Sequence, residues 1–246
     1  MTPDRPNRRG RAPDVPWADP ATGPGDLPLG FGRSLTPDLL RKAYAAGVFP
    51  WYNSGEPVLW WSPDPRAIIE LDGLHVSRRL ARTIRSGKFR ATVNHAFLDV
   101  MLGCGEHRSE GTWVHDEMVA AYTALHAEGD AHSVEVWAPT DAGGWELAGG
   151  IYGVAVGGLF AGESMFHRRT DASKVALVAL VERLRARGFV LFDVQMTTEH
   201  TERMGAVNIP RAEYLARLRE AVRLSHVRFA DEERSPTGES PAEVNR

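Results

Sequence analysis

An acid and an amide stand two residues apart in the segment LFDVQM, residues 191–196. In a β-strand successive side chains point to opposite faces, so Asp193 and Gln195 share one face and the apolar residues beside them form a core face. A carboxylate and an amide so placed can hold each other and a substrate between them. If their face lines a cleft, we expect the chemistry of the protein there. Alternation alone favours another interpretation, a half-exposed edge strand whose polar residues face water.

Glu163 is a second candidate, because it lies in the otherwise apolar and small-residue segment LFAGESMF, residues 159–166. A lone carboxylate in such a strand needs a partner. One interpretation is a ligand contact in a cleft, and the other is an ion pair with Arg168, Arg169 or another base. The sequence favours neither.

Basic residues dominate the span 73–98, which contains no acidic residue. They are Arg78, Arg79, Arg82, Arg85, Lys88 and Arg90. In the helix predicted after Ser77, Arg78, Arg82 and Arg85 recur at helical spacing and share one face. Such a stripe suits a phosphate backbone, whose neutralisation releases counterions. The alternative is a solvated helix face that is paired with acids elsewhere in the fold.

Aromatic residues cluster between residues 49 and 61, at Phe49, Trp51, Tyr52, Trp60 and Trp61. Trp51 follows a proline in an expected loop and is the better candidate for stacking on a base. We expect Trp60 and Trp61 to close a small N-terminal core. The segment around Trp113 supports either interpretation.

The elements that must position these residues follow from periodicity and from turn residues. Helices are predicted at 36–47, 77–87, 116–129, 171–188 and from Pro210. Strands are predicted at 132–138, 145–156, 159–167 and 189–196. The aromatic, proline-broken segment 48–69 is predicted to be a loop. This order indicates a mixed α/β sheet with helices packed on it.

The chain has 246 residues, of which 43% are hydrophobic, enough for one large domain with a small one beside it. We expect a disordered leader at 1–28, where seven of the sixteen prolines lie, and a polar, disordered tail at 229–246. Between them we expect a small N-terminal domain at 29–72 and a larger catalytic domain at 73–228.

Composition and missing motifs exclude several classes of function. The net charge of −3 argues against a globally basic nucleic-acid-binding protein. A single cysteine, Cys104, excludes an internal disulfide and fits a reducing, cytoplasmic setting. No apolar run reaches the length of a membrane span. The histidines lack metal-ligand spacing and no glycine-rich phosphate-binding loop occurs, so we expect no metal, ATP or NAD.

A family resemblance is carried by several strings of the sequence, among them LWWSPDPRA (59–67), GESMF (162–166), DASKVAL (171–177) and FDVQM (192–196). In order, and nearly collinearly from about Leu29 to about Leu224, the chain resembles bacterial leucyl/phenylalanyl-tRNA–protein transferases. The resemblance implies an α/β (α+β) fold with a small N-terminal domain and a GNAT-like mixed sheet. It implies transfer of Leu or Phe, and less readily Met, from aminoacyl-tRNA to proteins that begin with Arg or Lys. The product that the resemblance implies is an N-degron for protein degradation.

The resemblance also implies the roles of individual residues. Asp193 and Gln195 fall on the proposed catalytic pair. The charge pattern of the six basic residues makes them the candidates for contacting tRNA. Substrate contacts are implied for Trp51, Trp113, Ile151, Phe160, Glu163, Ser164 and Met165. Ile151 stands where Met is expected, and Thr198 where Asn is expected. Regular alternation would place Phe160 and Met165 on opposite faces, which a bulge at Gly162 would reconcile.

The aminoacyl ester is already activated, so this reaction needs no cofactor. Asp193 would orient and polarise Gln195, whose carbonyl would accept a hydrogen bond from the attacking amine. The proton would then pass to water or to the terminal ribose hydroxyl, and the sequence leaves this choice open. Two rival functions are an acetyl-CoA-dependent N-acetyltransferase, for which the junction 167–174 lacks glycine, and a non-catalytic RNA-binding module, which leaves Asp193 and Gln195 unexplained.

Overall fold

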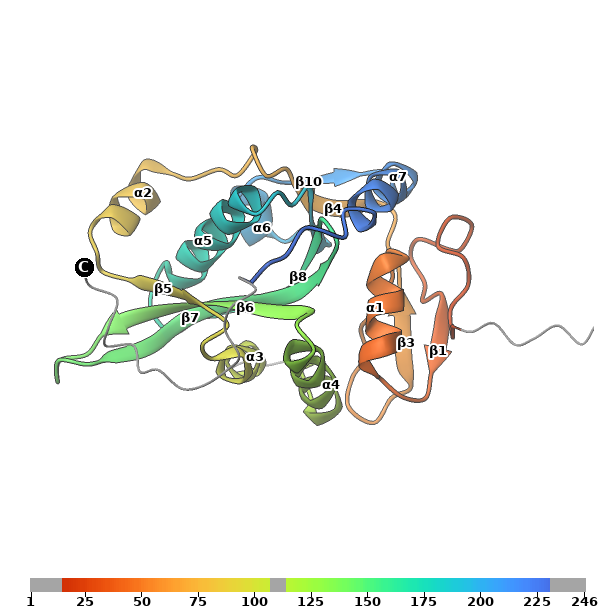
Figure 1. Ribbon diagram of the computed structural model, residues 1–246, viewed down its shortest axis with the longest axis horizontal. Coiled ribbons are helices and arrows are strands. Elements are labelled where there is room, and N and C mark those ends of the chain that lie inside the picture. The colour runs from red at the N-terminus through yellow and green to blue at the C-terminus, as the bar shows by residue number, and fades with distance from the viewer. Residues whose placement is uncertain (1–14, 107–113, 231–246) are drawn as a thin grey trace, which may run out of the picture.

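Two β-sheets and seven helices make up the part of the chain that this computed structural model describes, residues 15–106 and 114–230 (Figure 1). The small sheet is antiparallel, with the strand order β1-β3-β2. It consists of β1 (Gly30–Gly32), β2 (Phe49–Pro50) and β3 (Val58–Trp61), and α1 (Pro37–Ala45) follows β1 in the chain. Thr36 caps α1 by accepting a hydrogen bond from the backbone N of Leu39 at 3.3 Å, which confirms the predicted helix start.

The large sheet has seven strands in the order β10-β4-β9-β8-β7-β6-β5. They are β4 (Arg66–Ile69), β5 (Arg90–Val93), β6 (Ala131–Pro139), β7 (Trp145–Val156), β8 (Leu159–His167), β9 (Leu191–Gln195) and β10 (Ala206–Ile209). Only the pair β8 and β9 is parallel among these seven. A parallel pair needs a crossover connection, which α5 (Ala172–Ala186) supplies. The predicted mixed α/β fold is confirmed.

Helices cover both faces of the large sheet (Figure 1). On one face α5 packs against β6, β7 and β8, with α2 (Arg78–Arg85) beside it. The other face carries α3 (Phe97–Gly105) and α4 (Asp116–Ala127). After β9 the chain forms α6 (Glu199–Arg203) and α7 (Arg211–Val222). Within the described ranges, no helix is both long and apolar enough to cross a membrane.

Residues 48–69, which were expected to form a loop, instead contain β2, β3 and β4. These strands are only two to four residues long, so alternation has no room to show. Trp60 of β3 is fully buried, as predicted for a residue that closes the N-terminal core. Because β4 pairs with β9 and β10, the large sheet begins at residue 66, ahead of the expected domain boundary after residue 72.

Residues 15–28 pack on the small sheet, although the whole leader was expected to be disordered. Trp17 is buried against Trp60, with the two ring centroids 4.7 Å apart. Near the other end, Phe229 is 1% exposed and stacks on Phe160 at 5.1 Å, so the core extends past residue 228. A buried aromatic ring anchors each segment, together with hydrogen bonds from Arg211 to the carbonyls of Gly23 and Pro24 and from Arg183 to the carbonyl of Phe229.

Candidate active site

A cavity of about 550 Å³ opens where the parallel pairing of β8 and β9 ends. This pairing runs from Leu159 opposite Leu191 to Ala161 opposite Asp193. Ligands of α/β sheets commonly bind outside the carboxyl ends of parallel strands. The remaining walls come from β2 and the residue after it, from one residue each of β4 and β7, from the first turns of α5, and from α6 with the residue that precedes it.

Most residues with an implied role at the substrate meet in this cavity. Its lining includes Trp51, Ile151, Glu163, Ser164, Met165 and Gln195. Trp113 lies outside the described residues. Of the described candidates, Asp193 and Phe160 do not line the cavity, and each stands behind its wall.

Glu163 reaches the cavity because β8 is irregular at that residue. Tyr152 of β7 pairs with Ser164 and its neighbour Gly153 pairs with Gly162, so Glu163 is an extra residue in β8. A β-bulge of this kind bends the strand and re-aims a side chain. A bulge was predicted at Gly162, and the structure places it one residue further along the strand, at Glu163.

Phe160 and Met165 pack against the same core, as the bulge requires, but only Met165 lines the cavity. Phe160 is 1% exposed, and its ring lies 5.1–6.3 Å from the rings of Phe189, Phe192 and Phe229. It therefore stands behind the cavity lining in this structure, and its implied place in the pocket for the transferred side chain stays a prediction. It supports Phe192, which does line the cavity, from behind.

Asp193 is 0% exposed, and β9 lies between β4 and β8, so the interpretation as a half-exposed edge strand is wrong. Arg66 of β4 donates two hydrogen bonds to the carboxylate, from Nε to Oδ1 at 2.9 Å and from Nη2 to Oδ2 at 2.6 Å. The hydroxyl of Tyr214 donates to Oδ2 at 2.8 Å, and the backbone N of Gln195 donates to Oδ1 at 2.9 Å. Each carboxylate oxygen thus accepts two hydrogen bonds.

The sequence prediction missed Arg66. Its guanidinium also donates to the carbonyl O of Gly47 at 3.1 Å and lies over the rings of Phe49 and Tyr214, at 5.0 and 4.5 Å. Burial is the largest single influence on the pKa of Arg66 and lowers it, but the combined effects of Asp193, Tyr214 and Glu163 give a net rise. The side chains of Arg66 and Asp193 form a buried ion pair. An arginine directly before the apolar run AII was the available signal, since a buried charge needs an opposite one.

Gln195 ends β9 in the left-handed region, with φ at 63°, which few non-glycine residues adopt. The hydrogen bond from its backbone N to Asp193 holds this conformation. Its side-chain Nε2 donates to Oε1 of Glu163 at 2.6 Å. Asp193 thus orients Gln195 through the backbone, and Glu163, which was not predicted to do so, holds the amide.

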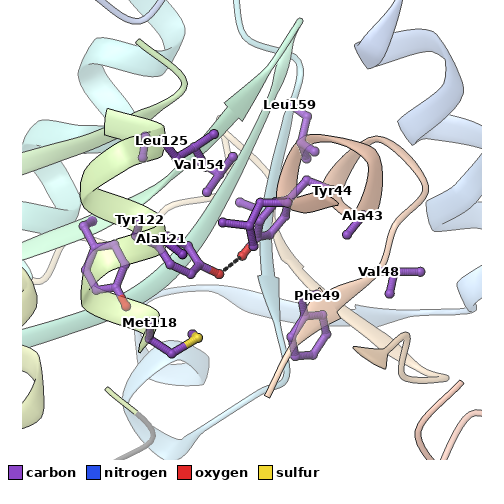
Figure 2. Packing of buried hydrophobic residues seen from close by; sticks show 14 of the residues in the cluster. Ala43, Tyr44, Val48, Phe49, Met118, Ala121, Tyr122, Leu125, Val154 and Leu159 are labelled. Atoms are coloured by element: carbon purple, nitrogen blue, oxygen red, sulfur yellow. Dashed lines mark hydrogen bonds between the residues drawn. The ribbon is translucent and has the colours of Figure 1, made fainter. Parts of the chain in front are cut away.

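Arg168 and Arg169, the ion-pair partners considered for Glu163, form ion pairs with other glutamates instead. The second oxygen of Glu163, Oε2, accepts a hydrogen bond from the hydroxyl of Tyr122 at 3.3 Å. Figure 2 shows that Tyr122 of α4 points toward Tyr44 of α1, and their hydroxyls are hydrogen-bonded. Burial raises the pKa of Glu163 to about 7, against hydrogen bonds that lower it.

Trp51 stands at the mouth of the cavity and is 41% exposed. Its backbone O accepts a hydrogen bond from the indole of Trp61 at 2.8 Å, which fixes the loop while the ring of Trp51 stays open to a stacking partner. Thr198, in place of the expected Asn, caps α6. Met196 and His200 also line the cavity and were not predicted.

Comparison with known proteins identifies the family of this chain. Residues 68–219 match the family described as leucyl/phenylalanyl-tRNA protein transferase, and residues 33–64 match the N-terminal domain of that family. The chain belongs to the leucyl/phenylalanyl-tRNA protein transferase family. Along the chain, the N-terminal match ends at residue 64 and the other begins at residue 68. The boundary between them therefore lies next to the start of β4, the first strand of the large sheet along the chain.

Individual relatives cover nearly the whole folded part of this family member. The leucyl/phenylalanyl-tRNA–protein transferase of Magnetococcus marinus is 51% identical over 205 residues, 82% of this chain and 87% of that protein. The protein of the same name from Anaeromyxobacter sp. is 51% identical over 212 residues, 85% of this chain and 88% of that protein. Among solved structures, that of L-PGS from Bacillus licheniformis is 12% identical, with a TM-score of 0.37, over 62% of this chain and 48% of that chain.

The basic residues of this transferase-family chain divide into two groups. Arg79 forms an ion pair with Asp171 at 3.2 Å, and Arg90 lies 4.0 Å over the ring of Trp145, so both are engaged within the fold. Lys88 lies over a phenylalanine ring at 5.3 Å. The other group is exposed and, within the described ranges, forms no ion pair: Arg78, Arg82 and Arg85.

Proposed function

We propose that this protein transfers leucine or phenylalanine from aminoacyl-tRNA to the α-amine of an acceptor protein, forming a peptide bond. One observation carries the proposal in a chain of this family. The cavity sets an apolar wall beside a hydrogen-bonded carboxylate and amide, Glu163 and Gln195. The wall suits an apolar amino-acid side chain, and the polar pair suits an amine.

The apolar wall is the proposed pocket for the transferred side chain. It is lined by Ile69, Ile151, Met165, Leu177 and Phe192. Such a wall discriminates by shape, at about 1–3 kcal/mol per methylene, so we expect Leu and Phe to be accepted and Met less readily.

Positioning is the main contribution of the protein, because the ester of aminoacyl-tRNA is already activated. Holding the amine and the ester in line can supply up to about 7–11 kcal/mol of the barrier. Glu163 holds Nε2 of Gln195, which leaves Oε1 of the amide to accept a hydrogen bond from the attacking amine. Asp193 is a positioning residue here, since it is buried behind Gln195.

The exposed basic face of α2 is the proposed contact for tRNA phosphates, with Trp51 stacking on the terminal adenine. The ion pair between Arg79 and Asp171 places α2 beside the start of α5, where Ser173 lines the cavity. An acceptor stem on α2 would therefore lead its end toward the cavity.

The finer parts of the function rest on the family. We propose acceptors that begin with Arg or Lys, a product that serves as an N-degron, and the cytoplasm, where aminoacyl-tRNA is available. The acetyl-CoA alternative is disfavoured by Asp171, whose carboxylate stands directly before α5. A pyrophosphate would meet this negative charge at the helix start, where it needs backbone N–H groups.

Labelled Leu-tRNA incubated with a peptide that begins with Arg tests the proposal. We expect labelled peptide from the wild type and none when the peptide amine is acetylated. Gln195→Ala should lower kcat while leaving the Kd for Leu-tRNA unchanged. Transfer of acetyl from acetyl-CoA without transfer from Leu-tRNA would refute the proposal, and tRNA binding without either transfer would leave an RNA-binding module.

A further inference from the structure

Peptide-bond formation from an ester requires a proton carrier. The amine nitrogen attacks the carbonyl carbon and becomes positively charged in the tetrahedral intermediate, so it must lose a proton. When the bond from that carbon to the 3′-oxygen breaks, the leaving oxygen must gain one. The net reaction neither consumes nor releases a proton, so one carrier that first accepts and then donates is sufficient.

Asp193 is unsuited to carry this proton. The side chain is 0% exposed, and both carboxylate oxygens already accept hydrogen bonds from Arg66 and from a second donor each. Protonation would leave the buried Arg66 without its counter-charge, at a cost of several kcal/mol. Gln195 does not titrate.

Glu163 is the carboxylate that faces the substrate space. Among the described lining residues of the cavity, no other Asp or Glu occurs. The bulge in β8 aims its side chain there, while Gln195 and Tyr122 donate one hydrogen bond to each of its oxygens. Each oxygen has a second lone pair, so a proton on a bound amine has an acceptor next to the amide that would hold the amine.

The groups around Glu163 suit a carrier that both takes and gives a proton. Tyr44 and Tyr122 face it from α1 and α4, Asp193 from β9, and the cation of Arg66 from β4. Burial and the charge of Asp193 raise the pKa of Glu163, while hydrogen bonds from the tyrosines and Gln195 lower it. The net value of about 7 lies close to that of a free α-amine, about 7.7–8.0.

We infer that Glu163 is the general base and then the general acid of the transfer. Its carboxylate takes the proton from the nitrogen as the bond between nitrogen and carbon forms. The protonated side chain then returns that proton to the 3′-oxygen as the ester bond breaks, and the carboxylate is restored. The inference rests on the proposed function, since it assigns the proton of that reaction.

Glu163→Gln tests the inference, because it keeps the size of the side chain and one oxygen that can accept the hydrogen bond from Gln195, but it cannot carry a proton. The measurement is the single-turnover rate of transfer from Leu-tRNA to saturating Arg-peptide between about pH 5.5 and 9. In the wild type, ionisation of Glu163 and of the amine should give a log-rate slope of about 2 at low pH. Glu163→Gln should lower the rate at least about 100-fold and reduce the slope to about 1.

Two further variants separate a chemical role from a structural one. Glu163→Asp keeps a titrating group and should retain the slope of about 2 at a reduced rate. Glu135→Gln is the matched control, since Glu135 is a buried glutamate on β6 that does not line the cavity, and it should keep the wild-type profile. If Glu163→Gln fails to fold, the profile of Glu163→Asp alone decides.

Several results would overturn the inference. The first is a rate above about a tenth of the wild-type rate in Glu163→Gln, and the second is the wild-type slope in that variant. The third is a slope of about 1 in Glu163→Asp. If Glu163→Gln transfers normally and the wild type fails with tRNA that ends in 2′-deoxyadenosine, the proton would be assigned to the ribose hydroxyl. A wild type without transfer at any pH would instead refute the proposed function.

Discussion

The buried ion pair between Arg66 and Asp193 gives a quantitative prediction. Arg66→Met removes both hydrogen bonds to the carboxylate, at 2.9 and 2.6 Å, and leaves the negative charge of Asp193 buried without a counter-charge. Breaking one side of a buried pair costs about 3–5 kcal/mol. For a chain of this size, about 2–4 °C per kcal/mol translates this loss into a fall in Tm of about 6–20 °C.

Thermal and urea unfolding, followed by circular dichroism, measure this loss. Arg217→Met is the matched control, because Arg217 is 39% exposed and pairs with Glu70 and Glu213 on the surface. Exposed pairs contribute about 0–1 kcal/mol, so we expect little change. The double variant Arg66→Met with Asp193→Leu leaves no unpaired charge, and we expect it to be more stable than Arg66→Met alone.

Activity separates the two roles of the pair. The double variant should regain stability but not transfer, because the backbone N of Gln195 has lost the acceptor that holds φ at 63°. A loss below about 1 kcal/mol in Arg66→Met would show that the pair contributes no more than a surface pair. A double variant with wild-type kcat would show that Gln195 needs no anchor.

Three further predictions concern tRNA, specificity and pH. Replacing Arg78 and Arg82 with Ala should raise the KM for tRNA and reduce the salt slope of binding by about 1.5, measured by filter binding; an unchanged slope would make α2 an ordinary surface. Ile151→Ala should lower kcat/KM for Leu at least about tenfold relative to Phe, in competition between the two charged tRNAs; an unchanged ratio would place the pocket elsewhere. Burial lowers the pKa of His132 to about 3, from about 6.5 in the unfolded chain. Below about pH 6.5 the unfolded chain therefore binds a proton that the folded protein does not, and the free energy of unfolding falls as the pH is lowered. At pH 5 the loss is about 2 kcal/mol by urea unfolding, and His132→Gln should abolish that part of the pH dependence.

Local signals in the sequence were sufficient for the longer elements. Thr36 and Ser77 each stand before a helix as its cap, and both accept the expected hydrogen bond. The strands around the turn at 157–158 have enough residues to show their pattern. The short strands β2, β3 and β4 show no such pattern, because two to four residues are too few to reveal alternation. The burial of Trp60 and Ile68 depends on partners far away in the chain.

The candidate site was only half accessible to sequence reasoning, because its decisive contacts are long-range. Asp193 and Gln195 could be selected from their spacing, but alternation misjudged their exposure, since the strand order of the sheet decides it. Arg66 lies 127 positions before Asp193, so no local pattern joins them. The sequence alone cannot assign Phe160 to the core or to the pocket, because both faces of β8 are covered and an apolar residue there can belong to either.

Two irregularities on neighbouring strands explain why the reactive groups meet. The parallel pairing of β8 and β9 ends at Ala161 and Asp193, and the side chains that touch, Glu163 and Gln195, each lie two residues further on. In regular strands these positions would continue the ladder. Instead Glu163 occupies a bulge, and β9 has its own register shift against β4 beside the left-handed Gln195. The left-handed conformation of Gln195 costs about 1–3 kcal/mol and persists only where the surroundings hold it. The bonds from Arg66 and Tyr214 to Asp193 are those surroundings, so the buried face of β9 maintains the geometry that the cavity face uses.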